Sequence, residues 1–171
     1  NGSSIGTAVA DGAARAEDDA FILLTSGTAA RPKMVPLTQT AVCRSAFNAG
    51  HVLSLGPRDR LLNVLPLFHA HGLISGLLTA LAAGSSAICT NGFDAPSFFG
   101  WMRDLQPTWY TAVPTIHRAL LTAAEASPDR ARASSLRVIR SASSSLAPTI
   151  LHGLEAMFGV PVLETYGMTE A

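Results

Sequence analysis

Short apolar runs alternate with longer helical patterns along most of the chain, and this alternation limits the possible folds more than any other feature. Strands that alternate with helices are typical of a parallel sheet with helices covering both faces. The sequence therefore predicts a layered α/β fold with a mainly parallel sheet. The expected strands are Phe21–Leu24, Leu61–Leu65, Ala87–Cys89, Trp109–Ala112, Val138–Ile139 and Val162–Leu163, and the expected helices are Thr38–Leu53, Leu73–Ala83, Pro96–Leu105, Thr115–Ala126 and Pro148–Phe158.

Residues at the ends of the expected helices support these boundaries. Thr38 and Asp94 are suited to cap helix N-termini, and Pro96 and Pro148 are suited to first turns. Gly84 and Gly159 are suited to helix C-termini. The small and polar residues 1–19 predict a loop or incoming linker before this pattern begins.

Composition excludes several other kinds of protein. The 171 residues contain 12 Lys plus Arg and 12 Asp plus Glu, so the formal net charge is zero. The basic excess that most simply indicates nucleic-acid or acidic-membrane binding is therefore missing. Charged residues make up 14%, against about 25% in a typical soluble domain, and the mean hydropathy is +0.30. These values exclude disorder and predict a large core, with more apolar surface than the chain can cover alone.

The only candidate membrane segment, residues 61–93, lacks Asp, Glu, Lys and Arg. Pro66 and the break at Gly84 divide it into elements shorter than the roughly 20 residues of a transmembrane helix, so we expect no membrane span. Cys43 and Cys89 lack the neighbours of a disulfide framework or a zinc site, and no signal-like segment opens the chain. These features favour a reducing, cytoplasmic compartment.

Function is expected in the loops after strands, because ligands of open α/β sheets bind outside the carboxyl ends of the strands. The first loop contains Thr25, Ser26, Gly27, Thr28 and Lys33, which is the only lysine of the chain. Hydroxyl and backbone N–H groups can donate to phosphate oxygens, and a lysine adds a point charge. The spacing differs from the common P-loop, and a surface turn with a chance lysine is the alternative interpretation.

The second loop, residues 66–72 (PLFHAHG), places His69 and His71 two residues apart in an apolar stretch. These rings can bind a metal, orient a carboxylate or cap the next helix. No third ligand lies at a useful spacing, which disfavours a metal site.

The third and fourth loops are residues 141–148 (SASSSLAP) and 164–171 (ETYGMTEA). Small residues before a helix allow the backbone to approach a flat ring or a phosphate, although an ordinary loop with a capping serine fits equally well. In the fourth loop, Tyr166 can stack on a base, Thr169 can donate to a phosphate and Glu170 can bind Mg²⁺.

Together, in this order, the four loops resemble the motifs of the adenylate-forming acyl-CoA synthetase superfamily. Residues 25–33 resemble its phosphate loop, residues 66–69 its aromatic and histidine motif, residues 141–146 its adenine loop and residues 166–170 its YGMTE motif. The resemblance covers about residues 18–171. It implies that residues 20–171 are part of an AMP-binding N-terminal domain, and that the upstream part and the C-terminal domain are absent from the chain.

The resemblance also implies a reaction: a carboxylic acid and ATP give an acyl-adenylate and pyrophosphate, and CoA then displaces AMP. ATP, Mg²⁺ and CoA are thus the implied cofactor and co-substrates. By resemblance, the β- and γ-phosphates of ATP are bound by Thr25, Ser26, Gly27, Thr28 and Lys33, Thr169 contacts the α-phosphate and Glu170 binds Mg²⁺. The same resemblance implies that adenine is bound by Ser143, Ser144, Ser145, Tyr166, Gly167 and Met168. It also implies that His69 orients the reacting carboxylate.

Residues 109–117, 140–141, 145–148 and 161–164 are most similar to the oxalyl-CoA synthetase branch, and residues 68–72 also resemble malonyl-CoA synthetases. The two positions after the motif histidine, which line the acyl pocket of aryl-activating relatives, are Ala70 and His71. A small residue beside a hydrogen-bonding ring suits a short acid that carries a second carboxylate. We therefore expect an oxalate-like acid, with malonate next and a medium-chain or aromatic acid as further alternatives.

Three residues of the phosphate loop depart from the family pattern. Ala29 and Ala30 replace a Thr-Gly pair, and Met34 replaces a glycine, which restricts the backbone of the loop. A nucleotide-binding protein without thioester chemistry is therefore an alternative. We also expect residues 1–171 alone to be inactive, because the resemblance places the catalytic lysine beyond Ala171.

Overall fold

The computed structural model describes residues 12, 14–25, 32–125, 129 and 134–170. A five-stranded, fully parallel sheet forms its centre, with the strand order β4-β3-β5-β6-β7. The strands are β3 (Arg60–Asn63), β4 (Ser86–Cys89), β5 (Trp109–Ala112), β6 (Val138–Ser141) and β7 (Val162–Glu164). All four residues of β5 and of β6 are buried, as expected for inner strands covered on both faces.

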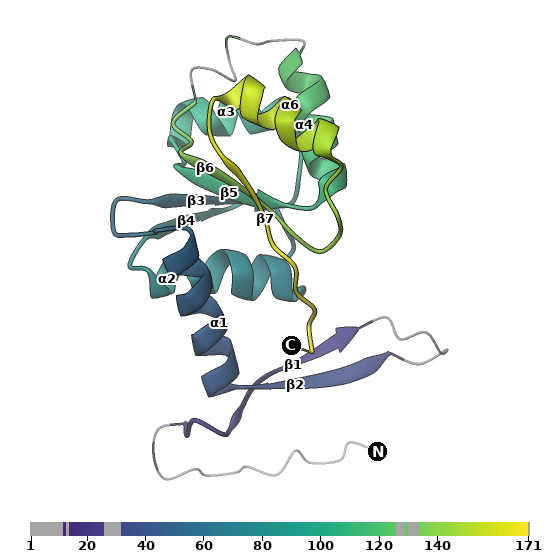
Figure 1. Cartoon of the computed structure of the whole chain (residues 1–171). Helices are drawn as coiled ribbons and strands as arrows, with labels where there is room; N and C mark the ends of the chain where they lie inside the picture. The colour runs from purple at the N-terminus through teal and green to yellow at the C-terminus, as the bar shows by residue number, and fades with distance from the viewer. Residues whose placement is uncertain (1–11, 13, 26–31, 126–128, 130–133, 171) are drawn as a thin grey trace.

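Helices cover both faces of this sheet (Figure 1), which confirms the predicted α/β class. One face carries α3 (Ala95–Leu105), α4 (Pro114–Glu125) and α6 (Pro148–Phe158); the other carries α1 (Gln39–Val52), η1 (His71–Leu78) and α2 (Thr79–Ala82). The predicted helix ends are also confirmed. Thr38 Oγ1 accepts a hydrogen bond from Ala41 N, Asp94 Oδ2 accepts one from Ser97 N, and Gly159 ends α6 in a left-handed conformation.

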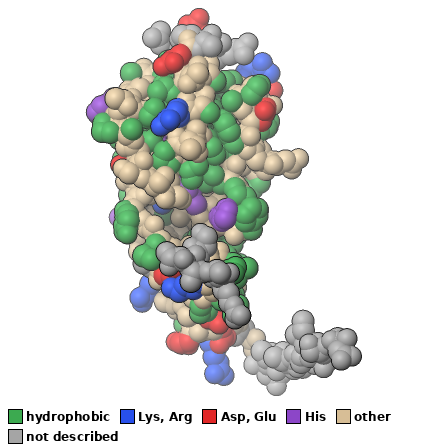
Figure 2. Space-filling model, turned by 90° about the vertical axis from the view of Figure 1, so that its right-hand side faces the viewer, with side chains coloured by type: hydrophobic (Ala, Val, Ile, Leu, Met, Phe, Trp, Pro, Cys, Tyr) green, Lys and Arg blue, Asp and Glu red, His purple; other side chains and the backbone are tan. Residues whose placement is uncertain are grey.

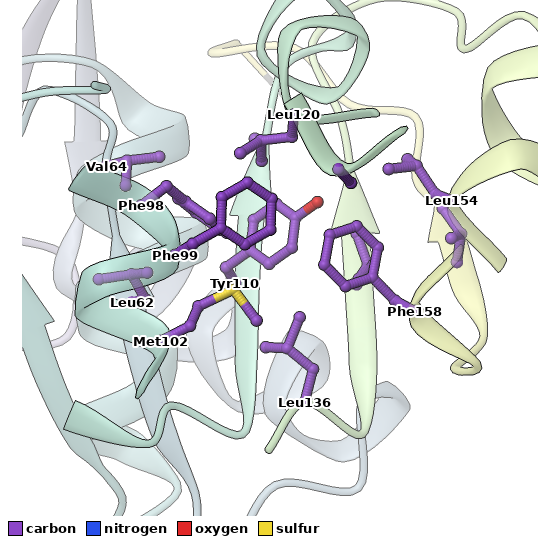
Figure 3. Close-up of a cluster of buried hydrophobic side chains, with 14 of the residues drawn as sticks. Leu62, Val64, Phe98, Phe99, Met102, Tyr110, Leu120, Leu136, Leu154 and Phe158 are labelled. Atoms are coloured by element: carbon purple, nitrogen blue, oxygen red, sulfur yellow. The ribbon is translucent and has the colours of Figure 1, made fainter. Parts of the chain in front are cut away.

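The larger hydrophobic core lies between the sheet and the layer of α3, α4 and α6 (Figure 3). Phe98 and Tyr110 pack edge to face at its centre, with ring centroids 5.2 Å apart. The Tyr110 hydroxyl lies 3.2 Å from His117 Nδ1, and His117 Nε2 lies 3.1 Å from the Ala112 carbonyl oxygen. This buried histidine is therefore fully hydrogen-bonded within the core.

The first predicted strand does not belong to the parallel sheet. It forms β1 (Asp19–Thr25) and pairs antiparallel with β2 (Lys33–Thr38), which the sequence analysis missed. Along β1, Ile22 and Leu24 are exposed, whereas Leu23 and Thr25 are half-buried. This alternation is typical of an antiparallel ribbon with one open face. The ribbon lies at the N-terminal end of α1, and the chain after β7 runs toward it (Figure 1).

The helix expected over Leu73–Ala83 also differs from the prediction. It begins earlier, at His71, and runs as the π-helix η1 before the short α2. Close packing explains part of this, because a Cβ atom at Gly72 would collide with the Pro66 carbonyl oxygen. Among the described residues, no helix combines the length and the apolarity needed to cross a bilayer.

Candidate active site

A cavity of about 1020 Å³ lies between the carboxyl ends of the central strands, helix α1 and the β1–β2 ribbon. All four loops that the sequence analysis singled out contribute to its wall. The predicted site residues that line it are Thr25, Lys33, His69, Ala70, His71, Ser143, Tyr166, Gly167, Met168, Thr169 and Glu170. The fold thus brings together distant segments of the chain, such as Lys33 and Glu170, which are 137 positions apart.

Five of the predicted site residues are not placed at the cavity by the described part of the structure, for two different reasons. Ser26, Gly27 and Thr28 fall outside the described residues. Ser144 and Ser145 are exposed and do not line the cavity, so Ser143 is the serine of this loop that reaches it. Their predicted roles in nucleotide binding therefore stay predictions.

Lys33 and Glu170 meet at one end of the cavity. Lys33 Nζ lies 3.3 Å from Glu170 Oε1, and Lys33 is also the register partner of Thr25 across the ribbon. The ammonium, the Thr25 hydroxyl and the nearby Thr169 form a set of donors suited to phosphate oxygens. This end therefore has the chemistry of a polyphosphate site, with one carboxylate beside it.

That carboxylate, Glu170, suits Mg²⁺ better than a metal that needs a complete protein cage. Among the described residues, no group of three or more His, Cys, Asp or Glu side chains is arranged to hold a metal ion. Mg²⁺ commonly binds one or two carboxylates together with substrate phosphates and water. Glu170 therefore fits as a single protein ligand of Mg²⁺ on a bound nucleotide.

The two histidines of the second loop have different surroundings. His69 is exposed and packs against the Phe68 ring, with centroids 4.5 Å apart. His71 Nδ1 lies 2.9 Å from Ser143 Oγ and His71 Nε2 lies 2.7 Å from Thr111 Oγ1. Both nitrogens of the second ring are thus bound to protein hydroxyls, so His71 joins the second loop to the third. Histidine side chains reach the surface at mid-height of the molecule (Figure 2).

Burial, followed by the nearby Arg140 charge and by His117, lowers the pKa of His71 to about 3. His71 is therefore neutral at physiological pH. It can exchange hydrogen bonds with hydroxyls but adds no positive charge to the cavity.

The third and fourth loops are held together beside the cavity. Glu164 Oε1 accepts a hydrogen bond of 2.7 Å from Leu146 N, and Thr165 N donates one of 2.9 Å to the Ser141 carbonyl oxygen. The side chain of Tyr166 lies beyond these contacts and is 96% exposed. Its ring is thus free to stack against a planar group that enters the cavity.

Arg140 is a cavity residue that the sequence analysis missed. It lies in β6, is 8% exposed, and lines the cavity beside Val113 and Ser75. Burial lowers the pKa of its guanidinium to about 10, so it stays charged at neutral pH. A charged residue inside a buried apolar strand is the signal in the sequence that could have identified it.

Comparison with known proteins agrees with this geometry. The profile of a family described as AMP-binding enzymes matches residues 4–171. The chain belongs to the AMP-binding enzyme family.

Similar members of the family include two ligases and one solved structure. The oxalate–CoA ligase of Arabidopsis thaliana is 48% identical over 91% of this chain and 30% of its own length. The sulfoacetate–CoA ligase of Cupriavidus necator is 38% identical over 88% of this chain and 29% of its own length. A malonyl-CoA ligase bound to methylmalonyl-CoA and AMP is 30% identical, with a TM-score of 0.86 over 95% of this chain and 35% of that one. The chain thus spans about a third of the length of these relatives.

Proposed function

We propose that this chain carries the acid-activating site of an ATP-dependent acid–CoA ligase. The observation that carries the proposal is the convergence of four separate loops on one cavity, with Lys33 and Glu170 at one end and His69, His71 and Arg140 along the rest. The proposed substrate is a short acid with a second acidic group, oxalate first and malonate next. The named substrates of the three similar proteins support this choice, since each carries a second acidic group.

In the proposed first step, a carboxylate oxygen attacks the α-phosphorus of ATP and the bond to the β-phosphate oxygen breaks, which releases pyrophosphate and leaves an acyl-adenylate. Two anions must approach each other, so the protein acts mainly by positioning and by neutralising charge. Lys33 and Thr25 hold the leaving phosphates, Thr169 contacts the α-phosphate, and His69 at the mouth orients the attacking carboxylate. Mg²⁺ held by Glu170 supplies additional positive charge on the phosphates.

In the proposed second step, the thiolate of CoA attacks the acyl carbon and AMP leaves with the electron pair of the broken acyl–oxygen bond. The adenine of this leaving group lies against Tyr166 and the Ser143 loop. Release of AMP then reopens the cavity for the next nucleotide.

The alternative function, nucleotide binding without thioester chemistry, depends on the unusual residues of the phosphate loop. Ala29 and Ala30 fall outside the described residues. Met34 lies in β2, its side chain is 67% exposed, and it does not line the cavity. Met34 therefore leaves the space for a nucleotide open, which both functions require, so turnover and not binding distinguishes the two.

Acid-dependent exchange between ATP and labelled pyrophosphate, measured on a full-length protein that contains this segment, tests the proposal. We expect exchange with short diacids, and we expect Lys33→Met to lower kcat/KM for ATP by about 100-fold. Arg103→Met is the control, because Arg103 is exposed and pairs only with the adjacent Asp104 among the described residues. ATP binding without exchange for any acid would support the alternative function instead.

A further inference from the structure

Arg140 differs from the paired arginines of the described chain. Arg137 pairs with Asp59 and Arg103 pairs with Asp104, but none of the four ion pairs found among the described residues includes Arg140. Among these residues, the Arg140 side chain makes one hydrogen bond: Nη1 donates to the Ser75 carbonyl oxygen at 3.2 Å. A guanidinium has five N–H donors, so most of its capacity is unused.

The surroundings of Arg140 offer no compensating charge. Its cavity neighbours Ile74, Ser75 and Val113 are uncharged, and His71 is neutral with both ring nitrogens occupied. In the described part of the chain, one carboxylate lines the cavity: Glu170, which lies 3.3 Å from Lys33, at the phosphate end. A charge that is more than nine-tenths buried without an opposite charge is costly, and a bound anion would remove that cost.

The position of Arg140 in the sheet places its guanidinium in the part of the cavity proposed to bind the carboxylic acid substrate, away from Lys33 and Glu170. Arg140 is the register partner of Thr111, which binds His71, and its own bond to Ser75 fixes it beneath η1. The loop that carries His69 leads directly into η1. His69 and Arg140 line the same cavity, so an acid oriented by His69 has space to extend along the start of η1 toward Arg140.

We propose that the Arg140 guanidinium binds the second acidic group of the substrate, the group that is not adenylated. This inference rests on the proposed function, because it assumes that an acid is activated in this cavity. A planar guanidinium can bind a carboxylate through two parallel hydrogen bonds, which fixes orientation as well as charge. A monocarboxylic acid leaves the buried charge unpaired, so Arg140 selects for diacids.

Paired substrates that differ only in the second charge test this role. In the exchange assay on the full-length protein, oxalate and malonate are each compared with their monomethyl esters. We expect wild-type protein to favour the better diacid over its ester in kcat/KM by roughly 30-fold or more. Arg140→Met should reduce that preference to less than about 3-fold while exchange with the ester persists. Arg140→Lys should be intermediate, and Arg103→Met should behave as wild type.

Two results would overturn the proposal. If Arg140→Met is folded and slows diacid and ester by the same factor, the residue only anchors η1 through Ser75. If wild-type protein does not distinguish diacid from ester, no residue reads the second charge, and this result holds even if Arg140→Met fails to fold. Both results leave the proposed acid activation intact, although the second contradicts the proposed preference for diacids. An absence of exchange with every acid overturns acid activation and this inference together.

Discussion

Three polar side chains, Asn63, Thr111 and Arg140, occupy one register row across β3, β5 and β6. Each one contacts η1: Asn63 donates to the Gly72 carbonyl oxygen, Thr111 binds the His71 ring, and Arg140 donates to the Ser75 carbonyl oxygen. Polar residues within buried strands need such partners. The row therefore attaches the wall of the cavity to the buried inner strands of the sheet.

His71 leads to a prediction about pH at the scale of the residue. Its folded pKa of about 3 is below the ordinary value of 6.5, so the unfolded chain binds a proton between these values that the folded chain does not. Its contribution to stability is therefore complete above pH 6.5 and is lost as the pH falls toward 3. Between pH 7.5 and 4.5, the free energy of unfolding of wild type should fall by roughly 1–2 kcal/mol more than that of His71→Gln.

Denaturant unfolding at both pH values measures this difference. His117, whose pKa burial lowers to about 4, contributes with the same sign in both proteins and cancels in the comparison. His152→Gln, at an exposed position on α6, is the control and should keep the wild-type pH dependence. Equal pH dependence in wild type and His71→Gln would show that the ring is not held neutral.

Site residues in loops could be predicted from the sequence, whereas those in strands could not. Lys33, His69 and Glu170 lie in short motifs whose order and chemistry are visible in the chain, and the structure places all three at one cavity. The roles of Thr111 and Arg140 in the site depend on strand register, which places them next to each other beneath η1. In the sequence, Thr111 looks like an ordinary strand residue, and Arg140 stands out only as a charge beside an apolar run, with nothing to show which residues it faces.

At the scale of the element, η1 depends on how closely it approaches the preceding loop. A Cβ atom at Gly72 would collide with the Pro66 backbone, whereas one at Gly76 would meet its nearest neighbour, the His71 carbonyl oxygen, at 3.4 Å. Gly72→Ala should therefore destabilise the protein by about 1–3 kcal/mol. Gly76→Ala, the matched control in the same helix, should change stability by less than about 1 kcal/mol.

Thermal unfolding of the two variants compares them under identical conditions. Gly72→Ala should also weaken acid-dependent exchange, because the shifted loop carries His69 and Ala70. Equal stability of the two variants would mean that the loop yields easily, and that close packing at Gly72 does not determine where η1 begins.

The elements that the sequence analysis identified are those whose pattern is strongly periodic or capped. The five parallel strands were predicted because each contains a short apolar run, longest where both faces are buried, and the helices were predicted from their periodicity and caps. The β2 strand, KMVPLT, has no such run and contains Pro36, which cannot donate to a ladder. The π-helix was predicted as an ordinary helix because the feature that sets it apart, contact with the sheet and with Pro66, is not local in sequence.

At the scale of the whole molecule, the carboxyl ends and the amino ends of the parallel strands differ in function. The carboxyl ends of the strands face the cavity, and hydrogen bonds to Asp59 link the amino ends. Asp59 binds Arg137 through two hydrogen bonds of 2.7 and 2.8 Å and also accepts from Thr108, while Arg137 donates to the carbonyl oxygen of Leu53. This group connects β3, β5, β6 and the end of α1, so it holds the layers in place without touching the site.

Asp59→Asn should therefore reduce stability and leave the chemistry intact. The loss at pH 7 should be about 1–3 kcal/mol, less than for a fully buried pair because Arg137 is partly exposed. The Arg137 hydrogen bonds lower the pKa of Asp59 to about 2 from 3.8, so its contribution is complete above pH 3.8 and is lost as the pH falls toward 2. The difference in the free energy of unfolding between wild type and variant should thus become smaller below about pH 4.

Denaturant unfolding measures this difference, with Asp104→Asn, from an exposed pair, as the control. An unchanged free energy of unfolding at pH 7, or an altered acid preference in the folded variant, would contradict this division between the two ends of the strands.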